Sequence, residues 1–149
     1  MTPAHPIFAP RFYWLARVPP CAKRFIVSRT AFMPSSPAMN ATKAAAVTGF
    51  LGVSLGAFGA HGLKDVLTAN DTNAIWQTAV LYHLVHAVAA LWASEKHPLT
   101  VWIWLGGIGI FSGSLYLLAI TDVRWLGAIT PLGGLLLLAG WALLLRTRS

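Results

Sequence analysis

The stretch GFLGVSLGAFGAHGLK at residues 49–64 decides the fold. Its glycines recur at steps of three and four residues, so on a helix they form one smooth stripe. In a water-soluble helix each interior glycine costs roughly 1 kcal/mol relative to alanine. In a bilayer the same stripe lets a second helix backbone approach closely, and dispersion replaces the hydrophobic drive that lipid does not supply. The stretch therefore predicts a membrane-spanning helix with a close helical neighbour. The stripe consists of Gly49, Gly52, Gly56 and Gly59.

The composition also indicates a membrane protein. Of the 149 residues, 56% are hydrophobic and only 10% are charged, far from the usual balance of a soluble chain. The formal net charge of +7 does not indicate nucleic-acid binding, because the basic residues are scattered over tails and turns and form no basic face with aromatic rings. Positive flanks of membrane spans account for that charge better. The single cysteine, Cys21, excludes an intramolecular disulfide and any CxxC motif.

Four apolar segments of about 20 residues each match the length that a hydrocarbon core of ~30 Å requires. We predict an all-α fold, an integral membrane four-helix bundle with short connecting turns, within a domain at 41–149. Six of the seven tryptophans lie near the expected helix ends, where amphipathic rings prefer the headgroup level. Pro131 predicts a kink in the fourth helix, because it removes a backbone hydrogen bond. The helices are expected at about 44–63, 74–93, 99–120 and 125–145.

Residues 1–40 differ from the rest of the chain. They are basic and rich in proline and contain no acidic residue, and no periodicity in them predicts a packed element. We expect a disordered extension. A transit peptide is one interpretation. Another is an upstream start site, with the working protein beginning at Met33 or Met39.

The short loops predict the orientation. Lysines and arginines of loops gather on the cytoplasmic side of a membrane. The N-terminal flank, the second turn and the C-terminus share one side and hold Lys43, Lys96, Arg146 and Arg148. The other side holds Lys64 and Arg124. We therefore expect a multi-pass protein of the cell (inner) membrane with both termini in the cytoplasm.

No Asp, Glu, Lys or Arg lies inside the four expected segments, so the candidate functional groups are neutral. His83 and His86 share one face of the second helix. The first interpretation is structural: buried polar groups pair between helices, with His83 bonded to Ser54 or Ser112. The sharper alternatives are haem or metal ligation by the two histidines, or a lipid or quinone pocket lined by Tyr82, His86 and Tyr116. The candidate polar cluster is His61, Gln77, Tyr82, His83, His86, Ser112, Ser114, Tyr116 and Thr130.

Several strings of the chain resemble the YgdD-like family of small four-helix inner-membrane proteins of unknown function. The resemblance covers roughly residues 40 to 146, and its motifs agree in order and spacing. It implies an integral membrane location and four spans, and it implies no established activity, cofactor or catalytic residue. The matching strings are GAFGAHGLK at 56–64, Trp76 with Ala79, Tyr82-His83-x-x-His86, FSGSLY at 111–116, LGAITPLGG at 126–134 and Gly140-Trp141.

We expect a non-enzymatic bundle without a metal or cofactor that binds membrane lipids, another membrane protein or a second copy of itself. A second glycine stripe on the third segment would serve as a docking face if the first stripe does not face it; it consists of Gly106, Gly109 and Gly113. One alternative is an oligomeric channel or carrier for small solutes, lined by a neutral layer of His61, Gln77, Tyr116 and Thr130. A haem- or quinone-binding role through the face of His83 and His86 is the third hypothesis.

Overall fold

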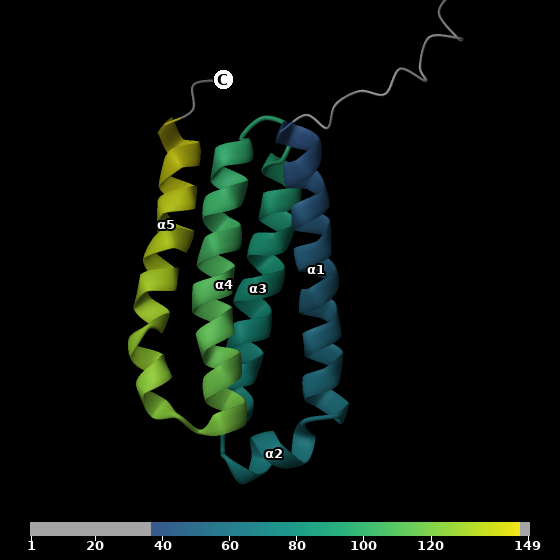
Figure 1. Ribbon diagram of the computed structural model, residues 1–149, viewed down its shortest axis with the longest axis vertical. Helices are drawn as coiled ribbons and strands as arrows, with labels where there is room; N and C mark the ends of the chain where they lie inside the picture. Colours follow the sequence, from purple (N-terminus) through teal and green to yellow (C-terminus); the bar gives the residue numbers. More distant parts are fainter. Residues whose placement is uncertain (1–36, 147–149) are drawn as a thin grey trace, which may run out of the picture. The chain divides into compact units, whose positions relative to one another are not determined.

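A computed structural model describes residues 37–146, which form helices and contain no strand. Four of its stretches are long and apolar enough to cross a membrane, and they confirm the predicted all-α, four-span architecture. The elements, labelled in Figure 1, are α1 (Pro37–His61), α2 (Lys64–Ala69), α3 (Asn73–Ala93), α4 (Pro98–Thr121), the 3-10 helix η3 (Arg124–Ala128) and α5 (Thr130–Arg146).

The first helix begins earlier than predicted. It starts at Pro37 instead of about residue 44, so residues 37–40 of the expected disordered extension are helical. A proline fits the first turn of a helix, where its missing N–H has no partner to lose. The next turns have a packing face, because Ala41 and Ala45 are fully buried in a core cluster with α3 and α4. The rest of the predicted extension lies outside the described residues.

The kink predicted at Pro131 takes the form of a change of helix type. The fourth span runs as a 3-10 helix to Ala128 and becomes an α-helix at Thr130. Pro131 has no N–H to donate to the carbonyl of Gly127, so the α-helical ladder cannot run through this point. Instead the Ile129 N–H donates to the Leu126 carbonyl at 3.1 Å.

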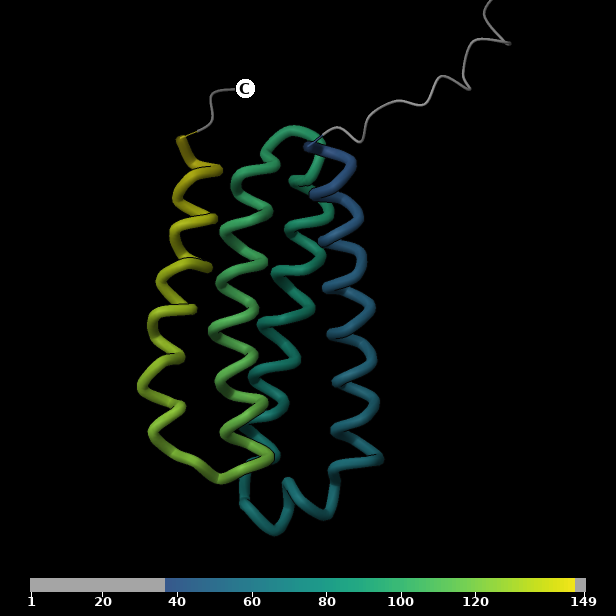
Figure 2. The backbone as a smooth tube through the Cα atoms, in the orientation of Figure 1, coloured from purple at the N-terminus to yellow at the C-terminus, as the bar shows by residue number. Residues whose placement is uncertain are grey.

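The four spans lie side by side in the order α5, α4, α3, α1 (Figure 2). α4 packs against α5 and α3, and α3 packs against α1, so α1 and α5 form opposite edges. The apolar windows of the two central spans bury 39% of their residues, against 17% for the outer two. Helix α2 crosses at one end, and the first residue of α1 and the last of α5 lie at the other (Figure 1).

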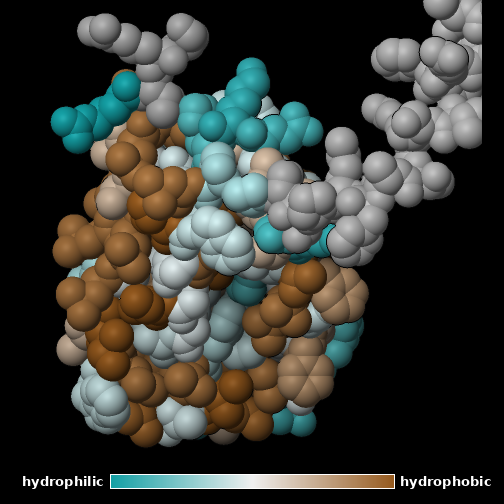
Figure 3. All heavy atoms as spheres, turned by 45° about the horizontal axis from the view of Figure 1, so that its top comes forward, coloured by the Kyte–Doolittle hydropathy of each residue, from teal (hydrophilic) through white to brown (hydrophobic). Residues whose placement is uncertain are grey.

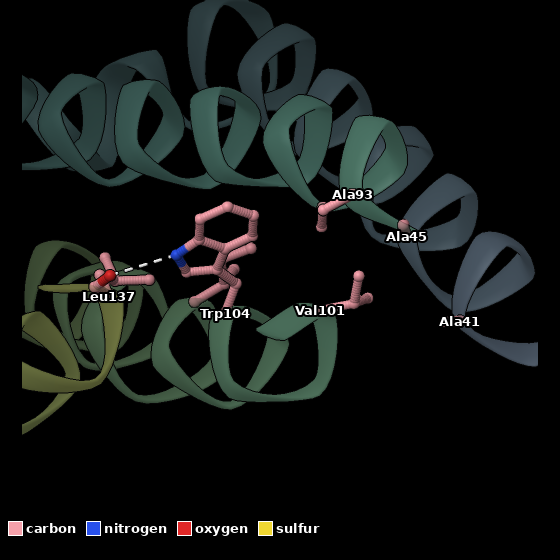
Figure 4. Close-up of a cluster of buried hydrophobic side chains, with 8 residues drawn as sticks. Ala41, Ala45, Ala93, Val101, Trp104 and Leu137 are labelled. Atoms are coloured by element: carbon pink, nitrogen blue, oxygen red, sulfur yellow. Dashed lines mark hydrogen bonds between the residues drawn. The ribbon is translucent and has the colours of Figure 1, made fainter. Parts of the chain in front are cut away.

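Two glycine–tryptophan contacts hold the outer helices to the central ones. Trp76 of α3 lies over Gly59 of α1, where an added Cβ would overlap the indole ring. Trp104 of α4 lies over Gly140 of α5 in the same way. Each indole N–H donates across the contact, Trp76 to the Leu55 carbonyl at 3.3 Å and Trp104 to that of Leu137 at 3.1 Å (Figure 4).

Six tryptophans were predicted to lie at the headgroup level of the membrane, and for Trp76 and Trp104 this prediction is wrong. The indole rings of Trp76 and Trp104 are buried at 1% and 0% exposure, although both residues lie near helix ends. Their N–H groups have partners inside the protein and need no headgroup. Trp92 and Trp125 are well exposed, as the prediction requires.

The glycine stripe of α1 is covered by α3 along its length. A Cβ at Gly52 would lie 2.7 Å from the Leu84 side chain, and one at Gly56 would lie 3.2 Å from Val80. The second stripe differs. At Gly106, Gly109 and Gly113 of α4, an added Cβ would meet nothing within 4 Å. The chain thus uses one stripe for its own packing and leaves the other uncovered by its described residues.

The loop between α2 and α3, at residues 70–72, caps the C-terminal end of α4. The last carbonyls of a helix lack partners within it and need donors from elsewhere. The Thr72 hydroxyl donates to the Ala119 carbonyl at 2.8 Å, and the Asn70 amide donates to that of Ile120 at 3.0 Å. Asp122 then ends α4 in the left-handed region at φ 52°. These bonds fix the loop beside the end of the helix that it caps.

The surface divides as a bilayer requires. In Figure 3 brown apolar side chains cover the flank of the molecule, and hydrophilic ones gather at the end of the bundle that faces the viewer. Large apolar side chains are exposed along every span, which in lipid is a favourable surface. They include Phe50, Val88, Leu117 and Leu138.

The glycine contacts predict a contrast between two alanine substitutions. A Cβ at Gly133 would lie 2.7 Å from the Phe111 Cα, so Gly133→Ala has to push α5 away from α4. We expect a loss of about 1–3 kcal/mol in the free energy of unfolding, typical of overpacking. Gly106→Ala enters open space and is expected to be neutral or to stabilise by up to about 1 kcal/mol. Denaturation by SDS in mixed micelles, followed by circular dichroism, measures both. Equal effects would contradict the packing described here.

Candidate functional site

His83 joins three helices from the middle of α3. Its Nε2 lies 2.9 Å from the carbonyl oxygen of Thr48 on α1, and its Nδ1 lies 3.3 Å from the hydroxyl of Tyr116 on α4. A carbonyl only accepts hydrogen bonds, so Nε2 carries the hydrogen and, in the neutral ring, Nδ1 accepts from Tyr116. The Tyr116 ring in turn packs on Trp76 with centroids 4.6 Å apart. His83 is thus a fully paired group in the core.

The hydroxyl groups of α4 bind its two neighbours. Ser112 donates to the Ala79 carbonyl of α3 at 2.9 Å, and Ser114 shares a 2.8 Å hydrogen bond with Thr130 of α5. The predicted pairing between helices is therefore present, but the partners predicted for His83 were wrong. Ser112 binds a backbone carbonyl, and Ser54 donates to the Phe50 carbonyl of its own helix.

His86 lies one turn further along α3 and has different partners. Its Nδ1 lies 2.9 Å from the Tyr82 carbonyl oxygen, and its Nε2 accepts from the Trp141 indole N–H of α5 at 3.1 Å. Here Nδ1 carries the hydrogen, so His83 and His86 are opposite tautomers. Both nitrogens of each ring are engaged. Ligation of a metal or a haem iron would require breaking one of these bonds, and residues 37–146 hold no group of three metal-ligating side chains.

The remaining members of the predicted cluster are not gathered with the histidines. His61 is exposed at the end of α1, and Gln77 is exposed on α3. Tyr116 is buried in the core between α3 and α4, whereas Thr130 lies at the contact of α4 with α5. The structure therefore does not join the four residues of the predicted neutral layer into one lining.

A groove of about 530 Å³ lies between α3 and α5, with α4 as its floor. It arises because α5 packs on α4 and reaches α3 mainly through the bond from Trp141 to His86. Gly134 adds to the space, since it presents no side chain there. No charged residue lines it. The lining residues are Tyr82, His86, Phe111, Pro131, Gly134, Leu135, Leu137, Leu138 and Trp141.

Aromatic rings form one continuous wall of this groove. Tyr82 packs on Phe111 with centroids 4.7 Å apart and stacks on His86 at 6.0 Å with an interplanar angle of 15°. His86 meets Trp141 edge-on at 6.1 Å. The Tyr82 side chain is 42% exposed, and its hydroxyl has no hydrogen-bond partner in the described part of the chain. It is the one lining side-chain group whose hydrogen-bonding capacity is unused there.

The pocket predicted from the sequence was right about Tyr82 and His86 and wrong about Tyr116, which is buried in the core and does not line the groove. The prediction also missed the α5 side of the groove. The three glycines of α5 are all typical of close packing, yet an added Cβ would overlap atoms of α4 only at Gly133 and Gly140. At Gly134 it would keep an ordinary 3.7 Å from the Phe111 ring of α4. Trp141 is one of the six tryptophans near expected helix ends, which were predicted to lie at the headgroup level. The available signal was Pro131 followed by two glycines, a pattern that both shifts a helix and removes side-chain volume.

The chain is similar to a set of membrane proteins of unknown function. The sequence model of the family described as "Protein of unknown function (DUF423)" matches residues 55–134. The chain belongs to the DUF423 family. It is 43% identical over 106 residues to the UPF0382 membrane protein of Staphylococcus epidermidis, which covers 66% of this chain and 86% of the relative. It is 39% identical over 109 residues to the UPF0382 inner membrane protein YgdD of Escherichia coli, covering 68% and 82%.

A third DUF423 relative is the UPF0382 membrane protein YwdK of Bacillus subtilis, 40% identical over 108 residues that cover 66% of this chain and 87% of the relative. No solved structure is significantly similar to the chain. The predicted resemblance to the YgdD-like family is confirmed. Together with the four apolar spans, these names establish an integral membrane protein. The matched region holds the groove residues from Tyr82 to Gly134, while Leu135, Leu137, Leu138 and Trp141 lie beyond it.

The hydrogen bonds predict the tautomers of the two histidines. We expect His83 to carry its hydrogen on Nε2 and His86 on Nδ1, because each of these atoms faces a backbone carbonyl. Imidazole ¹⁵N chemical shifts of the protein in micelles distinguish the two forms. Trp141→Phe removes the donor to His86 and is expected to shift the signals of that ring while leaving those of His83 in place. The same tautomer at both positions would contradict the assignment.

Proposed function

We propose that this DUF423 protein is a non-enzymatic binding protein that holds a lipid-soluble molecule in the groove between α3 and α5. The groove itself is the observation that carries the proposal. Its volume of about 530 Å³ is typical of ligand pockets. It is lined mainly by apolar and aromatic side chains, as such pockets usually are. Its residues come from the spans, so a ligand would enter from the bilayer and not from water.

The state of the polar groups supports binding over catalysis. Acid–base or nucleophilic chemistry needs a side chain free to exchange a proton or attack a substrate. Here His83 and His86 use both ring nitrogens in structural bonds, and Ser112 donates to a backbone carbonyl. No Asp, Glu, Lys or Arg lies in α3 or α4, the two central helices. The groove therefore offers shape and apolar contact.

A groove-filling substitution tests the proposal. Gly134→Leu places its side chain in the groove, where the first carbon keeps an ordinary 3.7 Å from Phe111. Displacing two methylene groups of a ligand, at about 0.8 kcal/mol each, lowers its affinity about tenfold, so less of it stays bound. Native mass spectrometry of protein released gently from its own membrane measures the retained apolar adduct.

Gly106→Leu is the matched control, because the same side chain enters open space on the lipid-facing side of α4. We expect it to keep the wild-type adduct. Equal adducts in the wild type and in Gly134→Leu would overturn the proposal. A circular dichroism spectrum of each variant shows that the helices are intact.

We also propose that both termini face the cytoplasm. Lys43, Lys96 and Arg146 lie at the end of the bundle where α1 begins and α5 ends, against Lys64 and Arg124 at the other end. This asymmetry follows the positive-inside rule. In a chain carrying Cys21→Ser, an impermeant maleimide added to intact cells is expected to label Thr68→Cys in α2 and to spare Glu95→Cys in the turn before α4, a position that leaves the lysines and arginines unchanged. The reverse pattern would contradict this orientation.

A further inference from the structure

We infer that the occupant of the groove is a neutral molecule with a flat, carbonyl-bearing ring and a hydrocarbon tail, the chemistry of a membrane quinone. The Tyr82 hydroxyl donates to one of its carbonyl oxygens. This inference rests on the proposed function and names the ligand class of the same site. Three observations on the lining carry it: an unpaired hydroxyl at mid-membrane depth, a wall of rings, and the lack of charge.

The depth of Tyr82 is the first observation. It lies nine residues from the start of α3 and eleven from its end, which places its Cα roughly 14–16 Å from each end at 1.5 Å per residue. Tyrosine normally sits at the interface, where its hydroxyl meets water or headgroups. At the centre of a bilayer an unpaired hydroxyl is costly, because hydrocarbon offers no hydrogen-bond partner. A ligand with an acceptor oxygen at this depth supplies one.

The wall of rings is the second observation. Tyr82, His86, Phe111 and Trp141 contribute adjoining rings to the groove. Aromatic faces favour offset stacking or edge contact with a flat π-system, which adds to the energy of burial alone. A saturated acyl chain gains nothing from this geometry beyond its apolar area. The wall therefore selects a planar ring over a plain hydrocarbon chain.

The lack of charge is the third observation. No lysine or arginine lines the groove, so it contains no partner for a phosphate group. The ester carbonyls of a phospholipid lie at the edge of the hydrocarbon core and not at its centre. The groove extends from Pro131 to Trp141 along α5, roughly 15 Å at the helical rise. That length accommodates a ring and the start of its tail.

Titration with decylubiquinone, a quinone with a short saturated tail, tests the inference. The full chain in detergent micelles is titrated with this probe, and bound quinone is counted by native mass spectrometry. We expect saturable binding of one molecule by the wild type and by Gly106→Leu, and binding about tenfold weaker in Gly134→Leu. Tyr82→Phe keeps the ring and removes the hydroxyl, so binding should weaken about three- to tenfold, as for one neutral hydrogen bond.

The outcomes separate the two proposals. Equal affinity of the wild type and Tyr82→Phe for the probe would overturn the hydrogen bond assigned to Tyr82. If the wild type retains a phospholipid that Gly134→Leu loses, and neither binds the probe, the quinone inference is wrong and the binding function stands. If Gly134→Leu changes no adduct, both fall. Leu138→Phe, at an exposed lining position, fills the groove independently should Gly134→Leu fail to fold.

Discussion

The contact of a tryptophan ring with a glycine on the next helix is the interaction on which this structure depends. Lipid supplies no hydrophobic drive between helices, so association relies on close packing and on hydrogen bonds. Trp76 over Gly59 and Trp104 over Gly140 provide both at once. In each contact the ring fills the notch left by the glycine, and its N–H reaches a carbonyl within about one turn of that glycine. One contact holds α1 to α3, and the other holds α5 to α4.

These two contacts also explain why the bundle has a lateral groove. Because the second contact fixes α5 to α4, α5 packs along α4 and makes little contact with α3. The hydrogen bond from Trp141 to His86 joins α5 to α3 directly. Nearer the start of α5, Gly134 contributes no side chain, and the 3-10 helix gives way to a new α-helical segment at Thr130, one residue before Pro131. The groove thus follows from backbone geometry as much as from the side chains that line it.

The spans could be predicted from the sequence because length and hydropathy depend on the bilayer alone. The sequence did not allow us to predict which helix covers which glycine stripe. The periodicity of Gly52 and Gly56 shows a smooth face, but the same pattern at Gly106 and Gly109 belongs to a face that residues 37–146 leave open. The hydrogen-bond partners of His83 could not be predicted for a related reason. One partner is the backbone carbonyl of Thr48, and because every residue type has such a carbonyl, the sequence does not show which one is used.

The pairing of the histidines determines what the groove can recognise. A buried polar group discriminates between ligands only if a wrong ligand leaves that group unpaired. His86 is satisfied within the protein, so its ring contributes a surface and no hydrogen bond to an occupant. The hydroxyl of Tyr82 is then the one hydrogen-bonding side-chain group of the described lining that is left to pair with an occupant. Since that hydroxyl lies in the middle of the span, the proposed ligand would be selected by the position of its oxygen along the membrane normal.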